Sequence, residues 1–261
     1  MTEKPKRQPI AKKKTTSWGG VAHWYDKLLA DEDTYQARVI LPNLLRAMSV
    51  KKGEQVLDLA CGQGFFTQAF FEEGAKATGV DLGKQLILIA KKNSPKEIEY
   101  FVQSAEDLSI FEDGSFDKIT IVLAIQNIEA PHKVFKECAR VLTPQGKLFI
   151  VLNHPAFRIP KASAWGFDED AKTQYRRIDN YMSESKVDIE MNPSKKGGAT
   201  TISFHRPLQY YFKTLANSGF AVARLEEWLS HRESELGPRK NAEDKARKEI
   251  PMFLFLETLK K

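Results

Sequence analysis

The sequence predicts an α/β protein with a doubly wound, mainly parallel sheet, and three observations support this fold class. From residue 54 onward, short apolar segments alternate with stretches of helical periodicity. The apolar segments are nearly continuous in Val, Ile, Leu and Phe, as in strands buried on both faces. A glycine-containing turn follows the first of them. We therefore expect helices to cover both faces of one sheet.

The elements follow in order along the chain. Strands are expected over residues 56–60, 76–81, 98–103, 116–124, 147–152, 220–228 and 251–259. Helices are expected over residues 65–73, 86–92, 131–142 and 208–217. Gly74 suits a left-handed helix end, Pro131 suits a helix start, and a turn is expected at residues 143–146. The last two strands are joined by a charged connection and are expected to be antiparallel.

Three segments lie outside this alternation. Residues 1–17 form a basic tail that is expected to be disordered, and residues 18–53 have helical periodicity that Pro42 should kink or divide. Residues 153–206 are too long for an ordinary loop. We expect them to form an insertion after the fifth strand, with a helix at 169–182 and a hairpin of strands 186–191 and 200–205. Residues 54–152 and 207–261 then supply the sheet.

The net charge of +6 comes almost entirely from the tail. Residues 1–14 hold six Lys or Arg and one Glu, so they carry +5 and the remaining 247 residues carry only about +1. A folded domain that binds a nucleic-acid backbone usually has a basic face. In the residues after the tail, acidic and basic side chains are nearly equal in number. Nucleic acid is therefore not the expected partner.

Neither a membrane span nor a metal site is predicted. No run approaches the roughly 18 apolar residues needed to cross a bilayer, and the N-terminus lacks the apolar stretch of a secretory signal. Cys61 and Cys138 are far apart, with no Cys-x-x-Cys pair or histidine cluster nearby. A soluble, cytoplasmic protein without a metal is expected, and the sequence does not predict its oligomeric state.

The turn after the first strand contains Gly62 and Gly64. Glycine adopts backbone conformations that other residues avoid and lets a ligand approach main-chain amides. A strand, a glycine turn and a helix start are moderate support for a nucleotide-like ligand. Two classes of ligand remain open on this pattern alone.

Charge favours one of the two. A dinucleotide fingerprint would place a third glycine at position 67, where this chain has Thr67, and a pyrophosphate beside the turn. The Asp58 carboxylate, four residues before Gly62, would repel that anion. S-adenosylmethionine has no phosphate but carries a sulfonium and an ammonium, which a nearby acid stabilises.

A second acid, Asp81, ends the next expected strand. A carboxylate about 20 residues past the turn is placed to accept the hydroxyls of an adenosine ribose in either kind of site. Asp81 could also cap the following helix, and the two roles are compatible. Asp81 therefore supports an adenosine-containing ligand but does not distinguish S-adenosylmethionine from a dinucleotide.

The chain resembles the class I S-adenosylmethionine-dependent methyltransferases, in particular the enzymes that act in quinone biosynthesis or methylate other small molecules. The resemblance rests on the motif Asp58-Leu59-Ala60-Cys61-Gly62-Gln63-Gly64, with Asp81 downstream. The resemblance covers residues 56–152. It implies a Rossmann-like sheet of seven strands with an antiparallel last strand. It also implies S-adenosyl-L-methionine as cofactor and a small-molecule methyl acceptor as partner.

The resemblance assigns roles residue by residue. Ser104 stands where the family often has an acid near the adenine, and the segment 18–53 should fold over the cofactor. The implied cofactor-binding residues are Tyr25, Asp58, Ala60, Cys61, Gly62, Gly64, Asp81, Leu82, Ser104, Ala105, Glu106, Leu123 and Ala124.

Methyl transfer from a sulfonium chiefly requires alignment and exclusion of water, although a hydroxyl acceptor benefits from a base. His154, just beyond the fifth strand, is the catalytic candidate, because ligands gather at the carboxyl ends of parallel strands. The alternative is a turn histidine that is hydrogen-bonded before a proline.

The expected walls of the acceptor site are polar and aromatic. Aromatic side chains could line a pocket for a ring-bearing acceptor or simply form core, and arginine could bind a carboxylate or phosphate. The candidate substrate-binding residues are Gln126, Asn127, Trp165, Tyr175, Arg176, His205 and Tyr210.

Three other functions remain open. A nicotinamide-dependent oxidoreductase would use the same glycine turn and Asp81, although Thr67 and Asp58 argue against it. A non-catalytic relative would keep the pocket and act as a partner subunit. Methylation of RNA or protein depends on the basic tail alone.

Overall fold

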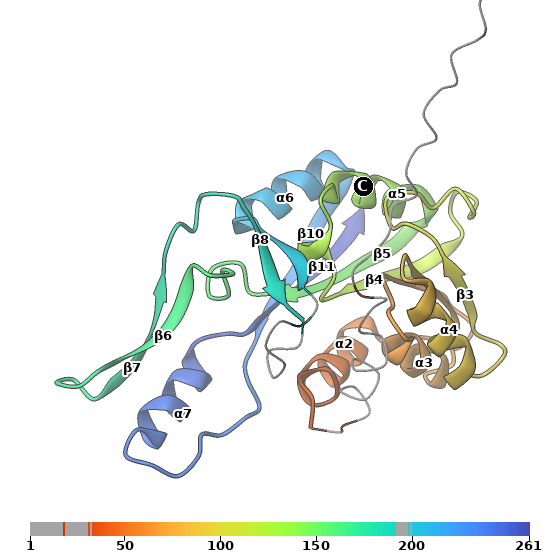
Figure 1. Cartoon of the computed structure of the whole chain (residues 1–261). Helices are drawn as coiled ribbons and strands as arrows, with labels where there is room; N and C mark the ends of the chain where they lie inside the picture. Colours follow the sequence, from red (N-terminus) through yellow and green to blue (C-terminus); the bar gives the residue numbers. More distant parts are fainter. Residues whose placement is uncertain (1–17, 19–30, 32, 192–197, 199) are drawn as a thin grey trace, which may run out of the picture.

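The computed structural model describes residues 18, 31, 33–191, 198 and 200–261 (Figure 1). The expected disordered tail and most of the helical segment before residue 33 lie outside the described residues. Within the described part of that segment, a π-helical turn at Gln36–Ile40 precedes α2 (Leu41–Met48). Pro42 lies in the first turn of α2, where the π-helical turn passes directly into the α-helix.

A seven-stranded sheet forms the centre of the molecule, in the order β10-β11-β5-β4-β1-β2-β3. Its strands are β1 (Gln55–Leu59), β2 (Lys76–Asp81), β3 (Glu99–Val102), β4 (Phe116–Val122), β5 (Leu142–Asn153), β10 (Phe220–Trp228) and β11 (Phe253–Lys260). The first five are parallel to one another, while β11 is antiparallel to both β5 and β10. The predicted fold class is confirmed.

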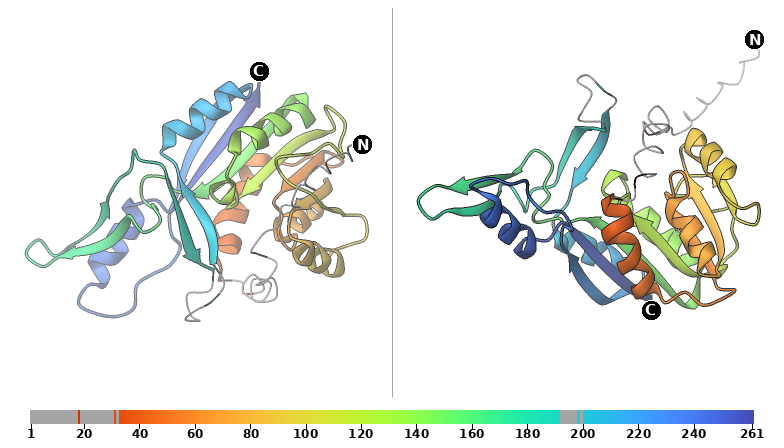
Figure 2. Two further views of the ribbon diagram at one scale, coloured as in Figure 1. Left: turned by 45° about the horizontal axis from the view of Figure 1, so that its top comes forward. Right: turned by 90° about the horizontal axis from the view of Figure 1, so that it is seen from below.

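Helices cover both faces of the sheet (Figure 2). One hydrophobic cluster joins the sheet to α2, α3 (Phe65–Glu72) and α4 (Lys84–Asn93). A second cluster joins the opposite face to α5 (Pro131–Val141) and α6 (Leu208–Asn217). On α5, the predicted stripe of Val134, Cys138 and Val141 is fully buried. Cys138 is therefore a core residue, as its position on that stripe indicates.

The chain order reverses between β1 and β4, which are neighbours at the middle of the sheet. Strands β2 and β3 extend the sheet on one side of this point, and β5 extends it on the other. Connections leave in opposite directions there, so a crevice opens at the carboxyl ends of the two strands. The glycine turn after β1 lies at this crevice.

The insertion after β5 consists of two hairpins rather than a helix and one hairpin. The expected hairpin is present as β8 (Ser185–Glu190) paired with β9 (Thr200–His205). The expected helix at residues 169–182 is wrong, because β7 (Thr173–Ile178) pairs there with β6 (Ser163–Asp168). Residues Thr173, Tyr175 and Ile178 favour a strand, and Asp168 accepts two amide hydrogen bonds that stabilise the turn.

Two further differences concern charged and turn segments. The charged connection before β11 contains a helix, α7 (Lys240–Glu249), which is polar almost all round and so lacks the apolar stripe that reveals a helix. Figures 1 and 2 show α7 beside the β6–β7 hairpin, away from the sheet. The expected turn at 143–146 is an irregularity within β5, where the pairing with β4 shifts register.

Among the described residues, no helix combines the length and apolar character that a membrane span requires.

Candidate active site

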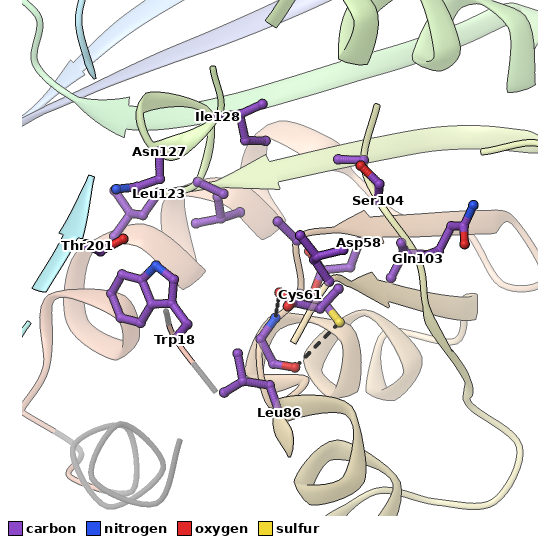
Figure 3. A pocket seen from close by; sticks show the side chains of 18 of the residues that line it. Trp18, Asp58, Cys61, Leu86, Gln103, Ser104, Leu123, Asn127, Ile128 and Thr201 are labelled. Atoms are coloured by element: carbon purple, nitrogen blue, oxygen red, sulfur yellow. Dashed lines mark hydrogen bonds between the residues drawn. The ribbon is translucent and has the colours of Figure 1, made fainter. Parts of the chain in front are cut away.

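A pocket of about 390 Å³ lies at the carboxyl ends of β1, β2 and β4 and is closed on one side by the β8–β9 hairpin (Figure 3). Most residues assigned to it from the sequence do line it. These are Asp58, Ala60, Cys61, Gly62, Asp81, Leu82, Ser104, Ala105, Glu106, Leu123, Ala124 and Asn127. The sequence pattern therefore located the pocket itself.

The glycine turn between β1 and α3 has a left-handed backbone at several positions. Ala60, Gly62 and Gly64 have φ values of +61°, +59° and +85°. A Cβ atom at Gly64 would collide with the hydroxyl of Tyr100, so both the backbone angle and the close approach require glycine there. Gly64 does not line the pocket; it precedes the first residue of α3 and sets where that helix begins.

Asp58 lies at the floor of the pocket and is 1% exposed. Thr67 donates a hydrogen bond of 2.6 Å to Oδ2, and Thr120 donates one of 3.1 Å to Oδ1. Burial raises the pKa of Asp58 to about 6, although the two threonine hydrogen bonds oppose the rise. Thr67, which stands where a dinucleotide fingerprint has glycine, therefore holds the acid in place. A cation in the pocket would stabilise the charged form of Asp58.

Asp81 receives two backbone hydrogen bonds. The Gly62 amide donates to Oδ2 at 3.0 Å and the Gly83 amide donates to Oδ1 at 2.6 Å. Burial raises the pKa of Asp81, and these amides act in the opposite direction. The expected link to the start of α4 is confirmed, because Gly83 is the residue before its first turn. Each carboxylate oxygen keeps acceptor capacity for a ligand hydroxyl.

Cys61 also lines this pocket. It is buried, and its Sγ donates a weak hydrogen bond to the Gly62 carbonyl at 3.7 Å. Burial raises the pKa of Cys61 well above its usual range, and the negative charge of Asp58 adds to this effect. A protonated, buried thiol is a poor nucleophile, so Cys61 shapes the pocket wall.

The far end of the pocket is built by residues that the sequence pattern did not single out. Thr201, Ile202 and Phe204 of β9 line it, and the side-chain amide of Asn127 donates to the Ile202 carbonyl at 2.8 Å. Figure 3 shows Trp18, Asn127 and Thr201 grouped at this end, with Gln103 and Ser104 at the other. The sequence signals for these walls were the strand predicted over residues 200–205 and the assignment of Asn127 to the acceptor site.

Further residues complete the lining between the two ends. The described residues that line the pocket and were not predicted to do so are Trp18, Gln63, Phe65, Phe66, Val80, Leu86, Gln103, Val122, Ile128, Glu129, Thr201, Ile202 and Phe204. Gln63 is 5% exposed, and its Oε1 has no hydrogen-bond partner among the described residues. A buried, unpaired acceptor at a pocket wall is suited to a ligand donor.

His154 does not lie in the pocket. Its Nε2 is 2.8 Å from Glu227 Oε1, and the Ala156 amide donates to its Nδ1 at 3.2 Å. Because Nδ1 accepts, Nε2 carries the proton and donates to Glu227. Burial lowers the pKa of His154, while Glu227 acts in the opposite direction. His154 is thus a hydrogen-bonded turn residue before a proline, which was the alternative to a catalytic role.

The structure also disperses the expected substrate walls. Arg176 stacks on Trp165 of the first hairpin at 5.2 Å and bonds the Phe157 carbonyl, outside the pocket. Tyr175 on the same hairpin is 47% exposed, and Tyr210 packs edge-on against Tyr211.

Two other candidates, Gln126 and His205, line a separate small cavity. The cofactor candidate Tyr25 lies outside the described residues. Within those residues, no group of three or more His, Cys, Asp or Glu side chains could hold a metal ion.

Comparison with known proteins agrees with this geometry. Residues 57–150 match the family described as a methyltransferase domain. The ubiquinone biosynthesis O-methyltransferase of Xanthomonas oryzae pv. oryzae is 37% identical over 101 residues, which are 38% of this chain and 42% of that protein. Across such curated relatives, the chain spans about half the length of the proteins it matches.

Solved structures extend the similarity to most of the chain. An S-adenosylmethionine-dependent methyltransferase from Mesorhizobium loti is 25% identical with a TM-score of 0.67, covering 88% of this chain and 99% of that one. The 1,6-didemethyltoxoflavin-N1-methyltransferase of Burkholderia thailandensis, solved with S-adenosylhomocysteine, is 14% identical with a TM-score of 0.55. It covers 94% of this chain and 85% of that one, and at this identity the likeness concerns the fold.

Proposed function

This chain belongs to the class I S-adenosylmethionine-dependent methyltransferases, and on that premise we propose that it methylates a small-molecule acceptor. The observation that carries the proposal is the pair of buried acids, Asp58 and Asp81, on either side of a glycine turn. The Asp58 carboxylate beside the turn disfavours a pyrophosphate and favours a cationic compound, and Asp81 supports an adenosine ribose.

The residues present fit this cofactor. When bound, S-adenosylmethionine supplies a methyl group on a positively charged sulfur. Asp81 would accept the ribose hydroxyls, and Asp58 would stabilise the positive charge of the methionyl part. The segment from Gln103 to Glu106 would hold the adenine. The unpaired Oε1 of Gln63 offers a further acceptor for a donor on the ligand.

The acceptor would enter at the end formed by β9. Phe204 and Ile202 provide an apolar wall there, and they exclude water from the path of an incoming nucleophile. Displacement at a methyl carbon depends mainly on alignment, which rigid walls supply. Glu129 is the acid at this end, where its exposed carboxylate pairs with Lys186 through one oxygen at 3.1 Å. We propose that its other oxygen accepts a proton when the acceptor is an O–H or N–H group. His154 does not fit that role, because it lies outside the pocket and donates a hydrogen bond to Glu227.

Other functions have weaker support. A nicotinamide-dependent oxidoreductase would need room for a diphosphate at the turn. The Asp58 carboxylate lies there, and Thr67 donates a hydrogen bond to it. Methylation of RNA or protein rests on a tail outside the described residues. A non-catalytic partner subunit would bind the cofactor and show no turnover, so the experiment below separates it from an enzyme.

Titration calorimetry with S-adenosylhomocysteine tests the cofactor site. We expect binding, and we expect Asp81→Ala to weaken it by about 1.5 to 3 kcal/mol, because charge-assisted hydrogen bonds to the ribose are lost. Asp113→Ala, at a carboxylate that is 79% exposed, serves as the control and should leave the affinity unchanged. Absence of binding by the wild-type protein would contradict the proposal. Formation of S-adenosylhomocysteine in an acceptor screen distinguishes an enzyme from a partner subunit.

A further inference from the structure

A second cavity, of about 30 Å³, adjoins the acceptor end of the pocket. Phe204 lines both cavities, so this residue lies where the two adjoin. Gln126 follows β4 and Asn153 ends β5, which places the small cavity at the carboxyl ends of these strands. It is lined as well by two arginines, Arg158 and Arg206, and by no acid among the described residues.

Arg206 is only 4% exposed. Its Nη2 donates to the carbonyls of Ile128 and Glu129 at 3.1 and 2.9 Å, and its guanidinium lies over the Phe204 ring at 4.7 Å. The carboxylate of Glu184, itself 59% exposed, is 3.9 Å from Nε. Nη1, however, has no hydrogen-bond partner among the described residues. A buried N–H donor on a charged group is costly to leave unpaired, so this atom is suited to an external acceptor.

Arg158 adds a second positive charge. Its side chain is partly buried and makes no hydrogen bond or ion pair within the part of the chain that the structure describes. The charges that act on it include the guanidinium groups of Arg176 and Arg247. Those two arginines bond a carbonyl and hydroxyls rather than carboxylates. This part of the molecule therefore holds an excess of positive charge next to the acceptor end.

Tyr211, Ser203 and Gln126 add uncharged polar side chains to the cavity wall. Burial raises the pKa of Tyr211 to about 12, so its phenol stays protonated and can donate to an anion. Ser203 offers a second hydroxyl. The Oε1 of Gln126 is an unpaired acceptor, which a water molecule or a hydroxyl of the ligand can satisfy.

We propose that this cavity binds a carboxylate group of the methyl acceptor, with Arg158 and Arg206 as its partners. The inference rests on the proposed methyltransferase function and narrows the acceptor to an anionic, ring-bearing compound. Arg158 has no acid partner among the described residues, and Arg206 has only the exposed Glu184 near Nε while its Nη1 is unpaired. These two guanidinium groups favour an anion, and bidentate pairing with a carboxylate is the geometry that arginine prefers. A volume of about 30 Å³ suits one small group rather than a whole molecule. Phe204 would then contact the ring to which the carboxylate is attached.

The experiment measures binding of three ring compounds to the protein saturated with S-adenosylhomocysteine. Benzoate carries the carboxylate, benzamide is its neutral counterpart, and phenyl phosphate tests the other common oxyanion. Calorimetry or ligand-observed NMR gives the affinities. We expect benzoate to bind at least tenfold more tightly than benzamide, and Arg158→Gln to lower the benzoate affinity by about tenfold or more. Phenyl phosphate binding more tightly than benzoate would overturn the assignment to a carboxylate.

Matched variants separate a binding role from a structural one. Arg158→Lys keeps the charge and should retain part of the benzoate affinity. Arg177→Gln removes an arginine that is 65% exposed and paired with Asp179, and it should change nothing. The affinity for S-adenosylhomocysteine, measured on every variant, reports a folded cofactor site independently of the acceptor. Normal cofactor binding combined with equal affinities for benzoate and benzamide, or with no benzoate binding, would overturn this inference and leave the proposed function standing. An unchanged benzoate affinity in Arg158→Gln would also overturn it.

Discussion

Replacing Asp58 by Asn should stabilise the ligand-free protein at neutral pH while weakening the cofactor. In the folded protein, burial raises the pKa of Asp58 from its ordinary value of 3.8 to about 6. A raised folded-state pKa means that the stability contribution of this acid is present at low pH and is lost as pH rises through about 6. Above that pH the folded protein holds a buried charge that the unfolded chain would solvate freely.

The structure sets the size of this effect. A rise from 3.8 to about 6 corresponds to about 3 kcal/mol at 1.36 kcal/mol per pH unit. Asn is neutral and similar in shape, and it can still accept from one threonine hydroxyl and donate to the other. Weaker bonds to Thr67 and Thr120 should cost about 1 kcal/mol. A net gain of about 1 to 2 kcal/mol is therefore expected at pH 7.5, with little or none at pH 4.5.

Urea unfolding of both proteins at the two pH values checks the prediction, with Asp113→Asn as an exposed-carboxylate control. Calorimetry with S-adenosylhomocysteine should show about tenfold weaker binding by Asp58→Asn, because the charge-assisted interaction with the ligand ammonium is lost. A stability difference that is the same at pH 4.5 and 7.5, or a loss of stability at pH 7.5, would refute this account of Asp58.

Two further predictions concern the packing of the sheet. Gly79→Ala should destabilise the protein by about 1 to 3 kcal/mol in urea unfolding, because its Cβ would lie 2.5 Å from the Tyr100 ring and 2.9 Å from Cys61 Sγ. Gly237→Ala meets nothing within 4 Å and should be neutral, and equal effects would contradict the packing argument. Glu257→Gln should cost about 1 to 2 kcal/mol at pH 7, because burial would raise the pKa of Glu257 but Lys147 and Arg224 lower it. A lowered pKa stabilises the protein fully above the ordinary value of 4.5, and this contribution is lost as pH falls through the folded-state pKa of Glu257. The cost should therefore shrink in acid, and a cost that did not change with pH would refute the ion-pair explanation.

The cofactor half of the site was predictable from sequence because local constraints determine it. Gly64 must be glycine against Tyr100, Asp58 lies one residue before the end of β1, and Asp81 ends β2. Both strands have the apolar sequence of buried strands, so motif and position coincide. The acceptor half was not, because its walls come from residues far apart in the chain. Phe204 and Thr201 reach the pocket only through the pairing of β9 with β8, and no local pattern states where that hairpin lies.

The errors have equally physical causes. His154 follows a parallel strand, where ligands gather, but Glu227 from β10 lies within hydrogen-bond distance and engages it. Nothing local to either residue reveals this pairing across 73 positions. The helix expected over residues 169–182 is absent, because cross-strand pairing with β6 places residues 173–178 in β7. Tertiary contacts decided both cases.

The Asn127–Ile202 hydrogen bond joins the core of the molecule to the inserted β8–β9 hairpin, and these two parts line different ends of the pocket. Asn127 belongs to the core that carries the glycine turn, whereas Ile202 belongs to the inserted hairpin. Exchange of the hairpin would leave Asp58, Asp81 and their hydrogen-bond partners in place. Such a division allows evolution, or an engineer, to alter which compound is modified while the apparatus for the methyl donor is inherited unchanged.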